Sequence, residues 1–447
     1  MKVHFIGIGG IGVSALAKYY IGKGHRVSGS DLVGSEITDA LKKKGVKIFI
    51  GPHKKENVPK GVDLVIYSPA VQKTNPELKK AFNIQYSKFN IQILSYPEAL
   101  GKLTKQHFTI AISGTHGKST TTAMLALILI KAGLDPTVII GTKLKEFGDS
   151  NFKAGKSKYL VIEADEHFAS FLNYWPKIIV LTNIEKDHLD YYKNLKNILR
   201  TFSKYVSHLP NDSVLVINGD DKNIRRMLIS NSQFLISKQI PIKKYSLKQP
   251  EAKQLKKILK VPGEHNVYNA LAALTAARAL KIPDKISFRA LSEYKGAWRR
   301  FEEYDLKFKN YKLKIISDYG HHPTKVRVTL LAAREKWPRK RIWCVYQPHQ
   351  YQRTYYLFRD FVKVFRQAPI DKIIITDIFD VVGRENTEIK KKVNSERLVK
   401  AIRKKNVIYL KKEEILDYLK KNVPQYEVLI IMGAGDIYKI SKNLTEK

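Results

Sequence analysis

The most informative segment for chemistry is the loop Gly114-Thr115-His116-Gly117-Lys118-Ser119. In a phosphate-binding loop, main-chain amides surround the phosphate, a lysine neutralises its charge and a hydroxyl holds Mg²⁺. This loop supplies all three, although it is shorter than the usual G-x-x-x-x-G-K-[ST], because Ile112 occupies the position five residues before Gly117. We predict that the loop and the following Thr120 bind the phosphates of a nucleotide.

Two acidic clusters follow predicted strands. Glu163-Ala164-Asp165-Glu166 comes after the strand 159–162, and Asn183-Ile184-Glu185-Lys186-Asp187-His188 comes after the strand 178–181. Carboxylates and a histidine at the carboxyl edge of a parallel sheet, beside a phosphate loop, can bind Mg²⁺ held by the nucleotide. Each cluster alone is also an ordinary surface turn, so the metal site rests on their combination with the loop.

A glycine turn lies near the start of the chain. Gly7, Gly9 and Gly12 are spaced as G-x-G-x-x-G, and Asp31 lies 19 residues beyond Gly12. Such a turn lets a diphosphate approach the amides at a helix N-terminus, and an acid at this distance is typical of dinucleotide-binding folds. Three interpretations stay open: a nicotinamide cofactor, another diphosphate such as that of a UDP-sugar, and glycines that serve helix–strand packing alone.

Further polar motifs occur in the last part of the chain. Gly263-Glu264-His265-Asn266-Val267-Tyr268-Asn269 leads into an alanine-rich helix predicted at 270–280, where the Asn and His side chains could meet an adenine edge or cap the helix. Arg299-Arg300 could clamp a phosphate or a carboxylate. The runs 318–323 and 347–353 close predicted strands, where substrate-facing loops belong.

These motifs must be positioned by alternating strands and helices. Strands are predicted at 3–6, 26–30, 62–67, 108–112, 159–162, 178–181, 314–317, 341–346, 372–376 and 428–432, and the first two glycine-bearing turns run into helices at 13–22 and 120–131. Alternation of this kind indicates parallel sheets with crossover helices, an α/β fold. The lysine-rich stretch 238–257 receives no assignment.

Length and composition limit the class of protein. The 447 residues suggest about three domains, and 44% hydrophobic residues exclude a disordered chain. Cys344, the single cysteine, excludes an internal disulfide framework and fits a reducing cytoplasm. The apolar run 3–17 imitates a signal peptide, but it contains four glycines, and the longest other apolar run, 123–130, is far too short to span a bilayer. We therefore expect a cytoplasmic protein without membrane contact.

The net charge is strongly positive. Lys and Arg number 80 against 41 Asp and Glu, which gives +39. A nucleic-acid-binding protein is one interpretation. However, the lysines are spread along the chain without interleaved aromatic residues, so we favour a solvated lysine-rich surface that attracts anionic small substrates and no specific nucleic acid.

The order of these motifs resembles that of the Mur ligases. The resemblance extends from the glycine turn through Ser68-Pro69-Ala70, Asn75-Pro76-Glu77, the phosphate loop, both acidic clusters and the 262–269 motif to Arg299–Glu302, 318–323, 347–353 and 433–436. It implies three domains: residues 1–106, Rossmann-like and binding a UDP-sugar; 107–296, a P-loop-type ATPase; and 297–447, Rossmann-like and binding an amino acid. A monomer or a homodimer is expected.

The resemblance is strongest to the branch that adds L-alanine to the lactyl carboxylate of UDP-N-acetylmuramate through an acyl phosphate, with ATP and Mg²⁺, in peptidoglycan precursor synthesis. Thr182-Asn183 and Gln347-Pro348-His349…Arg353 favour that branch over the one that recycles a murein tripeptide. An NAD-dependent oxidoreductase is the distant alternative. The preferred amino acid among alanine, glycine and serine stays open.

The resemblance also implies roles for individual residues. Lys118 and Arg300 would neutralise the transferring phosphoryl group, and Ser119, Glu163 and His188 would hold Mg²⁺. Asn266 and Asn269 would bind adenine, Asp318 the ribose, and His349 and Arg353 the acceptor and the alanine carboxylate. The UDP-sugar would bind at Gly7, Gly9, Gly10, Gly12, Ser14, Asp31 and Ser68. Departures from the family pattern occur at Ser119, His167, Phe168, Trp298 and Gly320.

Overall fold

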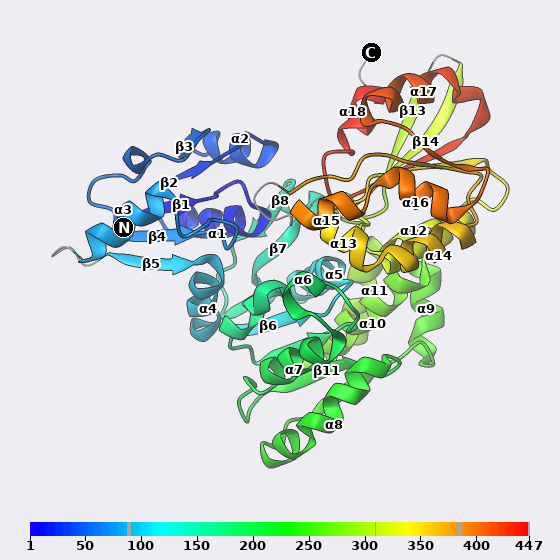
Figure 1. The fold of residues 1–447 in the computed structure, drawn as a ribbon. Helices are drawn as coiled ribbons and strands as arrows, with labels where there is room; N and C mark the ends of the chain where they lie inside the picture. Colours follow the sequence, from blue (N-terminus) through cyan, green and yellow to red (C-terminus); the bar gives the residue numbers. More distant parts are fainter. Residues whose placement is uncertain (87–90, 309, 382–386, 446–447) are drawn as a thin grey trace. The chain divides into compact units, whose positions relative to one another are not determined.

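The computed structural model of the protein describes residues 1–86, 91–308, 310–381 and 387–445. They form three β-sheets with flanking helices, which Figure 1 colours along the chain. The chain divides into two compact units. Unit 1 contains Met1–Ile184, Leu199–Ser246 and Leu271–Leu291, and unit 2 contains Glu185–Ile198, Leu247–Ala270 and Ser292–Lys447. The first two sheets lie in unit 1 and the third lies in unit 2.

The first sheet has the strand order β3-β2-β1-β4-β5, and every neighbouring pair is parallel. Its strands are β1 (Lys2–Ile6), β2 (Arg26–Asp31), β3 (Lys47–Ile50), β4 (Leu64–Tyr67) and β5 (Gln92–Ser95). The chain moves outward from β1 in one direction through β2 and β3, and then in the other through β4 and β5. Ligands of open α/β sheets bind beyond the carboxyl ends of the strands at such a reversal. The glycine turn follows β1 at this point.

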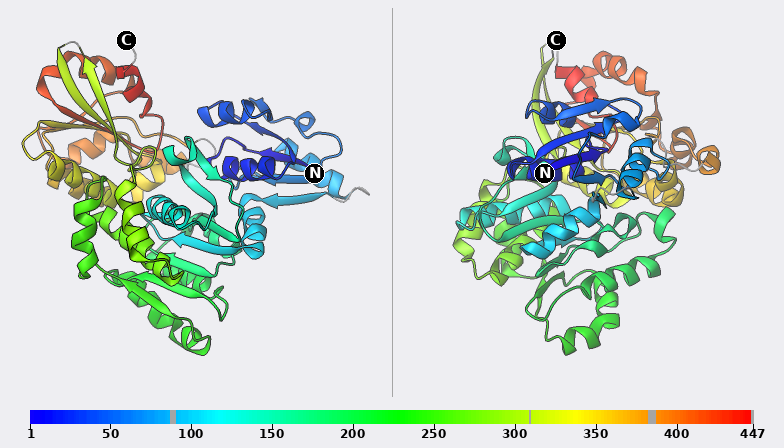
Figure 2. Two further views of the ribbon diagram at one scale, coloured as in Figure 1. Left: turned by 180° about the vertical axis from the view of Figure 1, so that it is seen from behind. Right: turned by 90° about the vertical axis from the view of Figure 1, so that its left-hand side faces the viewer.

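The second sheet places β6 at its centre, in the order β12-β11-β10-β6-β9-β7-β8. All its neighbours are parallel except β7 and β8, which form an antiparallel hairpin. Helix α5 packs on β6, β7 and β9, and it is seen from behind in the left view of Figure 2. The strands are β6 (Phe108–Ser113), β7 (Thr137–Leu144), β8 (Ser150–Lys153), β9 (Tyr159–Ala164), β10 (Ile178–Leu181), β11 (Val214–Asn218) and β12 (Ile242–Tyr245).

The third sheet has the order β13-β14-β18-β15-β16-β17, and only β13 runs antiparallel to its neighbour. Successive residues of β18 alternate between two cores, with Ile430 on one face and Ile431 on the other. This alternation is the period of two that a buried strand requires. The strands are β13 (Glu302–Phe308), β14 (Tyr311–Asp318), β15 (Ile342–Tyr346), β16 (Lys372–Ile375), β17 (Val407–Tyr409) and β18 (Val428–Met432).

The helices connect the strands and supply the apolar faces that cover the sheets. The helices around the first sheet are α1 (Ile11–Gly22), α2 (Glu36–Lys42), α3 (Pro76–Tyr86) and α4 (Tyr96–Gln106). Those that follow up to β13 are α5 (Lys118–Lys131), α6 (Leu189–Tyr192), α7 (Leu195–Val206), α8 (Lys222–Ser237), α9 (Pro250–Ile258), α10 (Glu264–Ala279) and α11 (Asp284–Glu293). The remainder are α12 (Pro323–Lys336), α13 (Tyr351–Tyr356), α14 (Phe358–Gln367), α15 (Thr387–Lys392), α16 (Ser395–Ile402), α17 (Ile415–Lys421) and α18 (Lys439–Thr445).

The predicted α/β architecture with parallel sheets is confirmed. Helix α10 begins at Glu264, six residues before the predicted start, because its first turn is built from the polar motif itself. The unassigned stretch 238–257 contains β12 and most of α9. Within the described residues, no helix is long and apolar enough to cross a membrane.

Candidate functional site

The phosphate loop joins the central strand β6 to helix α5, as predicted. Gly117 is the N-cap of α5, with φ at +84°. Gly114 has φ at +132°, and a Cβ atom there would collide with the side chain of Thr182. Both positions therefore require glycine. The loop delivers the chain into the N-terminus of a 14-residue helix, where the helix dipole favours a bound anion.

The first two residues after β10, Thr182 and Asn183, form hydrogen bonds with this loop. The main-chain amides of Thr115 and His116 donate to the main-chain oxygen and the side-chain Oδ1 of Asn183, at 3.0 and 2.9 Å. In return, Thr182 Oγ1 and Asn183 Nδ2 donate to the carbonyl oxygen of His116, at 2.6 and 3.0 Å. The Thr-Asn pair thus fixes the shape of the loop through four hydrogen bonds.

Lys118 lies in an acidic environment. Its Nζ donates to Gly114 O at 2.7 Å and to Glu166 Oε2 at 2.6 Å, and lies 3.5 Å from Asp165 Oδ1. Burial alone would lower the pKa of Lys118, but Glu166 and Asp165 raise it above its ordinary value. The lysine is therefore a fixed cation inside the loop.

Ser119 and Glu163 form an oxygen-rich pair beside the loop. Ser119 Oγ donates to Glu163 Oε2 at 3.1 Å, and the amide of Gly141 in β7 donates to Glu163 Oε1 at 2.6 Å. A hydroxyl and a carboxylate are ligands that Mg²⁺ prefers, so this donor set fits the predicted metal. His188, the third predicted ligand, belongs to unit 2, and its place in the metal site stays a prediction.

The glycine turn is held by the end of β2. The amides of Gly7 and Ile8 donate to the carbonyl oxygen of Ser30, at 2.8 and 3.0 Å. The amide of Gly9 donates to Asp31 Oδ2 at 2.8 Å, the same oxygen that a Cβ on Gly9 would meet at 2.8 Å. Asp31 therefore shapes the turn, whatever further contact it makes with a ligand.

Gly10, Gly12 and Ser14 were predicted to contact the UDP-sugar. Gly10 is the N-cap of α1. A Cβ on Gly12 would lie 2.8 Å from Cζ and Oη of Tyr96, so this glycine admits the tyrosine ring. Ser14 is buried, and its Oγ donates to Ile11 O at 2.9 Å and accepts from Asn151 Nδ2 at 2.9 Å. Gly12 and Ser14 thus contribute to packing, and their contact with the UDP-sugar stays a prediction.

Ser68 lies directly after β4. Its amide donates to Ile6 O at 2.9 Å, and its Oγ accepts from the amide of Ala70 at 3.3 Å. A Cβ on Gly7, whose φ is +79°, would lie 3.0 Å from the Cβ of Ser68. Ser68 therefore lies against the glycine turn, and its contact with the UDP-sugar stays a prediction.

The two asparagines predicted to bind adenine lie in the first turns of α10. Asn266 Nδ2 donates to Pro262 O at 2.7 Å, and Asn269 Nδ2 donates to Asn266 Oδ1 at 3.2 Å. Both are buried. Part of their hydrogen-bonding capacity therefore shapes the start of the helix, and their contact with adenine stays a prediction.

Asp318 ends β14 and organises the turn that contains Arg300. Its carboxylate accepts from the amides of Phe301 and Gly320, at 2.9 and 2.7 Å. Burial raises the pKa of Asp318 above its ordinary value. The guanidinium of Arg300 lies 5.0 Å from the ring centroid of Tyr319. The predicted contacts of Asp318 with ribose and of Arg300 with phosphate stay predictions.

Arg299 is the buried member of the arginine pair. Its guanidinium donates to the carbonyl oxygens of Gly433 and Gly435, the latter at 3.1 Å, and lies 4.3 Å from the ring centroid of Tyr438. Trp298, a departure from the family pattern, makes an edge contact with Tyr438 at 5.8 Å. Arg299 thus ties the arginine turn to the loop after β18, a link that the sequence motif did not reveal.

The structure also shows the surroundings of three other departures, His167, Phe168 and Gly320. His167 and Phe168 stack on one another at 4.1 Å, and Phe168 has φ at +52°. A Cβ on Gly320 would lie 2.8 Å from Asp318 Oδ1 and 3.0 Å from Met432 Sδ. Glycine at position 320 therefore makes room for the buried carboxylate.

Arg353 and Asp187 form a buried ion pair in unit 2. Arg353 Nε lies 3.1 Å from Asp187 Oδ1, and each side chain is 6% exposed. Burial alone would raise the pKa of Asp187, but Arg353, followed by His188, lowers it well below its ordinary value. The guanidinium also donates to His349 O at 3.3 Å, and the His349 ring stacks on Phe379 at 5.5 Å. The structure therefore brings His349 and Arg353 together with Asp187, a member of the second acidic cluster.

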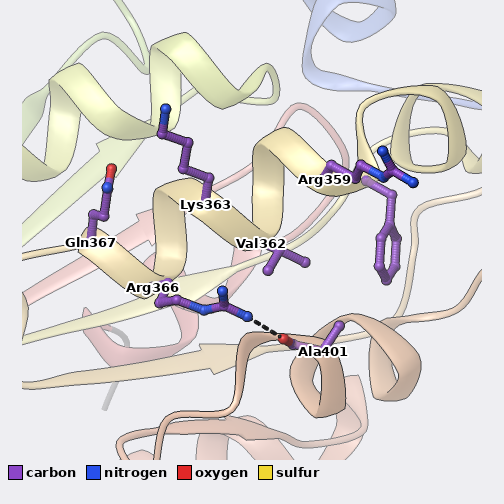
Figure 3. Close-up of a pocket in the computed structure, with 7 residues that line it drawn as sticks. Arg359, Val362, Lys363, Arg366, Gln367 and Ala401 are labelled. Atoms are coloured by element: carbon purple, nitrogen blue, oxygen red, sulfur yellow. Dashed lines mark hydrogen bonds between the residues drawn. The ribbon is translucent and has the colours of Figure 1, made fainter.

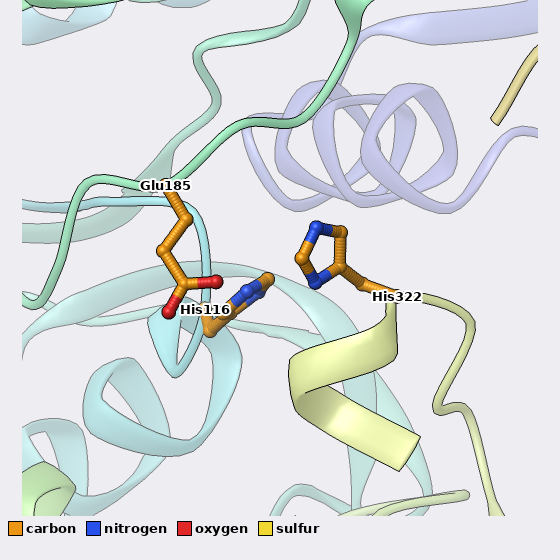
Figure 4. Close-up of side chains that lie close together, drawn as sticks. All are labelled: His116, Glu185 and His322. Carbon is orange, nitrogen blue, oxygen red and sulfur yellow. The ribbon is translucent and has the colours of Figure 1, made fainter. Parts of the chain in front are cut away.

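The histidine pair after β14 begins helix α12. His322 Nδ1 accepts from the amide of Thr324 at 3.2 Å, so its Nε2 donates to Lys186 O at 2.9 Å. Thr324 Oγ1 donates to Glu185 Oε2 at 2.6 Å. Figure 4 draws Glu185 and His322, both of unit 2, with His116 of the phosphate loop. Burial lowers the pKa of His322, which favours the neutral imidazole that these hydrogen bonds require.

A groove lies between α14 and α16, and its lining residues come after the 347–353 motif in the sequence. Figure 3 shows Arg359, Val362 and Lys363 along α14, with Arg366 donating to Ala401 O at 2.8 Å. None of its lining residues was predicted to bind a ligand. Arg366 caps the end of α16 through hydrogen bonds to the carbonyl oxygens of Ala401 and Ile402.

Other contact residues escaped the sequence analysis. Gly141 and Asn151 lie on the β7–β8 hairpin, and they reach Glu163 and Ser14 through single hydrogen bonds. A polar residue in a short strand carries no local signal for such a contact. Asn151 is the buried residue of β8, and its contact with Ser14 becomes apparent only once the strand pairing is known.

Family models and relatives cover nearly the whole chain. The model described as the Mur ligase family catalytic domain matches residues 2–108, that of the Mur ligase middle domain matches 112–277, and that of the Mur ligase glutamate ligase domain matches 299–435. A protein named UDP-N-acetylmuramate–L-alanine ligase from Clostridium tetani is 41% identical, covering 98% of this chain and 96% of its own. One of the same name from Acetivibrio thermocellus is 40% identical, covering 98% and 94%.

Solved structures show the same architecture. The crystal structure of UDP-N-acetylmuramate–alanine ligase from Thermotoga maritima is 27% identical, with a TM-score of 0.79 over 99% of this chain and 98% of its own. A murein peptide ligase from Psychrobacter arcticus, 23% identical with a TM-score of 0.72 over the same shares, has the same fold. With its three matching domains and its full-length relatives, the chain belongs to the Mur ligase family.

Proposed function

We propose that this enzyme joins L-alanine to the lactyl carboxylate of UDP-N-acetylmuramate, with the cleavage of ATP to ADP and phosphate, in the synthesis of peptidoglycan precursors. The observation that carries the proposal is similarity along the full length. Several proteins named for this reaction are 38–41% identical to the chain, and each alignment covers nearly all of both proteins.

The reaction needs activation of a carboxylate. A carboxylate oxygen attacks the γ-phosphorus of ATP, ADP leaves, and an acyl phosphate forms. The amine of alanine then attacks the acyl carbon, phosphate leaves, and the amine loses a proton to give the amide. Charge accumulates on the phosphoryl oxygens in the first step, so fixed cations nearby lower its barrier. Lys118, cationic within the loop, and Arg300 are assigned this role.

The nucleotide contacts are assigned to three motifs of the chain. The phosphates are assigned to Gly114, Thr115, His116, Gly117, Lys118, Ser119 and Thr120. Asn266 and Asn269 are assigned to adenine, and Asp318 to ribose. Mg²⁺, held by Ser119, Glu163 and His188, would neutralise the phosphate oxygens. The hydrogen bond between Ser119 and Glu163 supports the first two ligands.

The remaining substrates are assigned to the outer segments. The UDP-sugar is assigned to Gly7, Gly9, Gly10, Gly12, Ser14, Asp31 and Ser68, in a domain of residues 1–106. The ATPase domain is assigned to residues 107–296, and the amino-acid domain to 297–447, with His349 and Arg353 toward the acceptor and the alanine carboxylate. The backbone at Gly7 and Gly9, at the strand-order reversal of the first sheet, supports the diphosphate contact.

Phosphate release tests the proposal. Purified enzyme is supplied with ATP, Mg²⁺ and UDP-N-acetylmuramate, together with L-alanine, glycine, L-serine or the murein tripeptide. We expect release that depends on L-alanine, and a product one alanine residue heavier by mass spectrometry. Release with the tripeptide alone would assign the enzyme to the recycling reaction. Titration with NADH, followed by fluorescence, tests the oxidoreductase alternative and is expected to show no binding.

A further inference from the structure

A buried polar cluster joins the first sheet to helix α3 and to the segment between β3 and β4. Its centre is Glu77, the last residue of the Asn75-Pro76-Glu77 motif, at the start of α3. Glu77 and His4 in β1 are both fully buried, at 0% exposure. A carboxylate at such a site requires partners, because an unpaired buried charge is strongly unfavourable.

Four side chains, from β1, from β2 and from the segment between β3 and β4, meet the Glu77 carboxylate. His4 Nε2 and Ser30 Oγ lie 2.9 and 2.8 Å from Oε2, and His53 Nδ1 and Asn57 Nδ2 each lie 2.8 Å from Oε1. Burial alone would raise the pKa of Glu77, but these hydrogen bonds outweigh it and lower the pKa to about 2. Glu77 is therefore an ionised acceptor, and the facing histidine nitrogens carry hydrogens.

The cluster is connected to the glycine turn through Ser30. The hydroxyl of Ser30 donates to Glu77, while its carbonyl oxygen accepts from the amides of Gly7 and Ile8, at 2.8 and 3.0 Å. The next residue, Asp31, accepts from the amide of Gly9 at 2.8 Å. One dipeptide thus holds three consecutive amides of the turn, and the side chain of its first residue is fixed by Glu77.

We propose that Glu77 is a positioning residue for the UDP-sugar: by fixing Ser30, it holds the glycine turn in the conformation that receives the diphosphate. This inference rests on the proposed function, which assigns the diphosphate to that turn. An apolar side chain would fill the same space without a buried charge. Hydrogen bonds from four donors to one carboxylate are directional and fix the orientation of each donor, including the Ser30 hydroxyl, whereas an apolar contact would not.

The test compares Glu77→Gln with the unaltered enzyme in steady-state kinetics. A glutamine of nearly the same shape offers one acceptor oxygen and one donor group, so at least one of the four donors loses its acceptor. We expect the KM for UDP-N-acetylmuramate to rise about tenfold. The KM for ATP and kcat are expected to stay within about twofold, because the cluster belongs to the first sheet and its connections, whereas the phosphate loop follows β6 of the second sheet.

Two further variants keep the test decisive. Ser30→Ala removes only the hydroxyl link and is expected to raise the same KM by a smaller factor, so it serves if Glu77→Gln folds poorly. Glu56→Gln changes an exposed carboxylate of the neighbouring segment and is expected to leave every parameter unchanged. A general loss of folded protein would instead lower the apparent kcat and leave the KM of every substrate unchanged.

The outcomes separate this inference from the proposed function. Unchanged KM values in folded Glu77→Gln and Ser30→Ala, together with a raised UDP-sugar KM in Gly9→Val, would overturn the inference and leave the proposed site intact. A Gly9→Val enzyme with an unchanged UDP-sugar KM would overturn the diphosphate assignment, and the positioning role of Glu77 with it.

Discussion

Loss of the Arg353 guanidinium should leave a carboxylate stranded in the interior of unit 2. Asp187 and Arg353 are each 6% exposed, and their atoms approach to 3.1 Å. At an effective dielectric constant of about 20, two unit charges at this separation attract by about 5 kcal/mol. Removing one partner of such a pair typically lowers the free energy of unfolding by about 3–5 kcal/mol, because the other charge stays buried without its partner. Arg353→Met keeps much of the volume and removes the charge.

Differential scanning calorimetry measures the effect. For a unit of this size, about 3–5 kcal/mol corresponds to a fall in Tm of roughly 10 °C. The double variant Arg353→Met/Asp187→Asn removes both charges and should recover part of this loss. As a control, Lys391→Met breaks an exposed pair with Glu388, whose side chains are 74% and 67% exposed. That change should shift Tm by less than about 2 °C.

The pH dependence of the Tm difference distinguishes an unpaired buried charge on Asp187 from a packing defect. In the unaltered enzyme the pKa of Asp187 is held well below its ordinary value, so its contribution to stability is present above about pH 4 and is lost only as the pH falls below that. In Arg353→Met the main cause of the lowering is gone and burial raises the pKa of Asp187. The Tm difference between variant and parent should therefore shrink between pH 8 and pH 5. A difference of the same size at both pH values, or a double variant as unstable as the sum of the single variants, would refute the reasoning.

The other predictions concern the nucleotide and UDP-sugar sites. Lys118→Ala should lower ATP turnover at least about 100-fold, with UDP-N-acetylmuramate binding retained in calorimetry; unchanged turnover would contradict the phosphate-loop assignment. Ser119→Ala should raise the Mg²⁺ concentration for half-maximal rate about tenfold, whereas Ser119→Thr keeps the hydroxyl that meets Glu163 and should behave like the parent. In Gly12→Val, the new Cβ would lie 2.8 Å from Tyr96, so UDP-sugar affinity should fall while ATP affinity, measured in the same calorimeter, stays the same.

Local sequence was sufficient where the chemistry depends on neighbours along the chain. The phosphate loop, its glycines and the helix after it were predicted because glycine spacing, a lysine and a hydroxyl occur within one short run between a β-rich and a helical segment. The glycine turn and the acid at the end of the second strand were recognisable for the same reason. Helix α10 was placed too late, since polar residues at its start hid the beginning of the helical period.

Contacts between distant segments were decided by the tertiary structure. Glu77 is separated from His4 by 73 positions, and Asp187 from Arg353 by 166. The local pattern does not show that these carboxylates are buried or which residues they pair with, because burial and partners arise only when strands pair and helices pack. The sequence by itself therefore determined the α/β class, the phosphate loop and the glycine turn. Only the folded chain decided which charges are buried and paired, since that depends on strand order and packing rather than on neighbours in sequence.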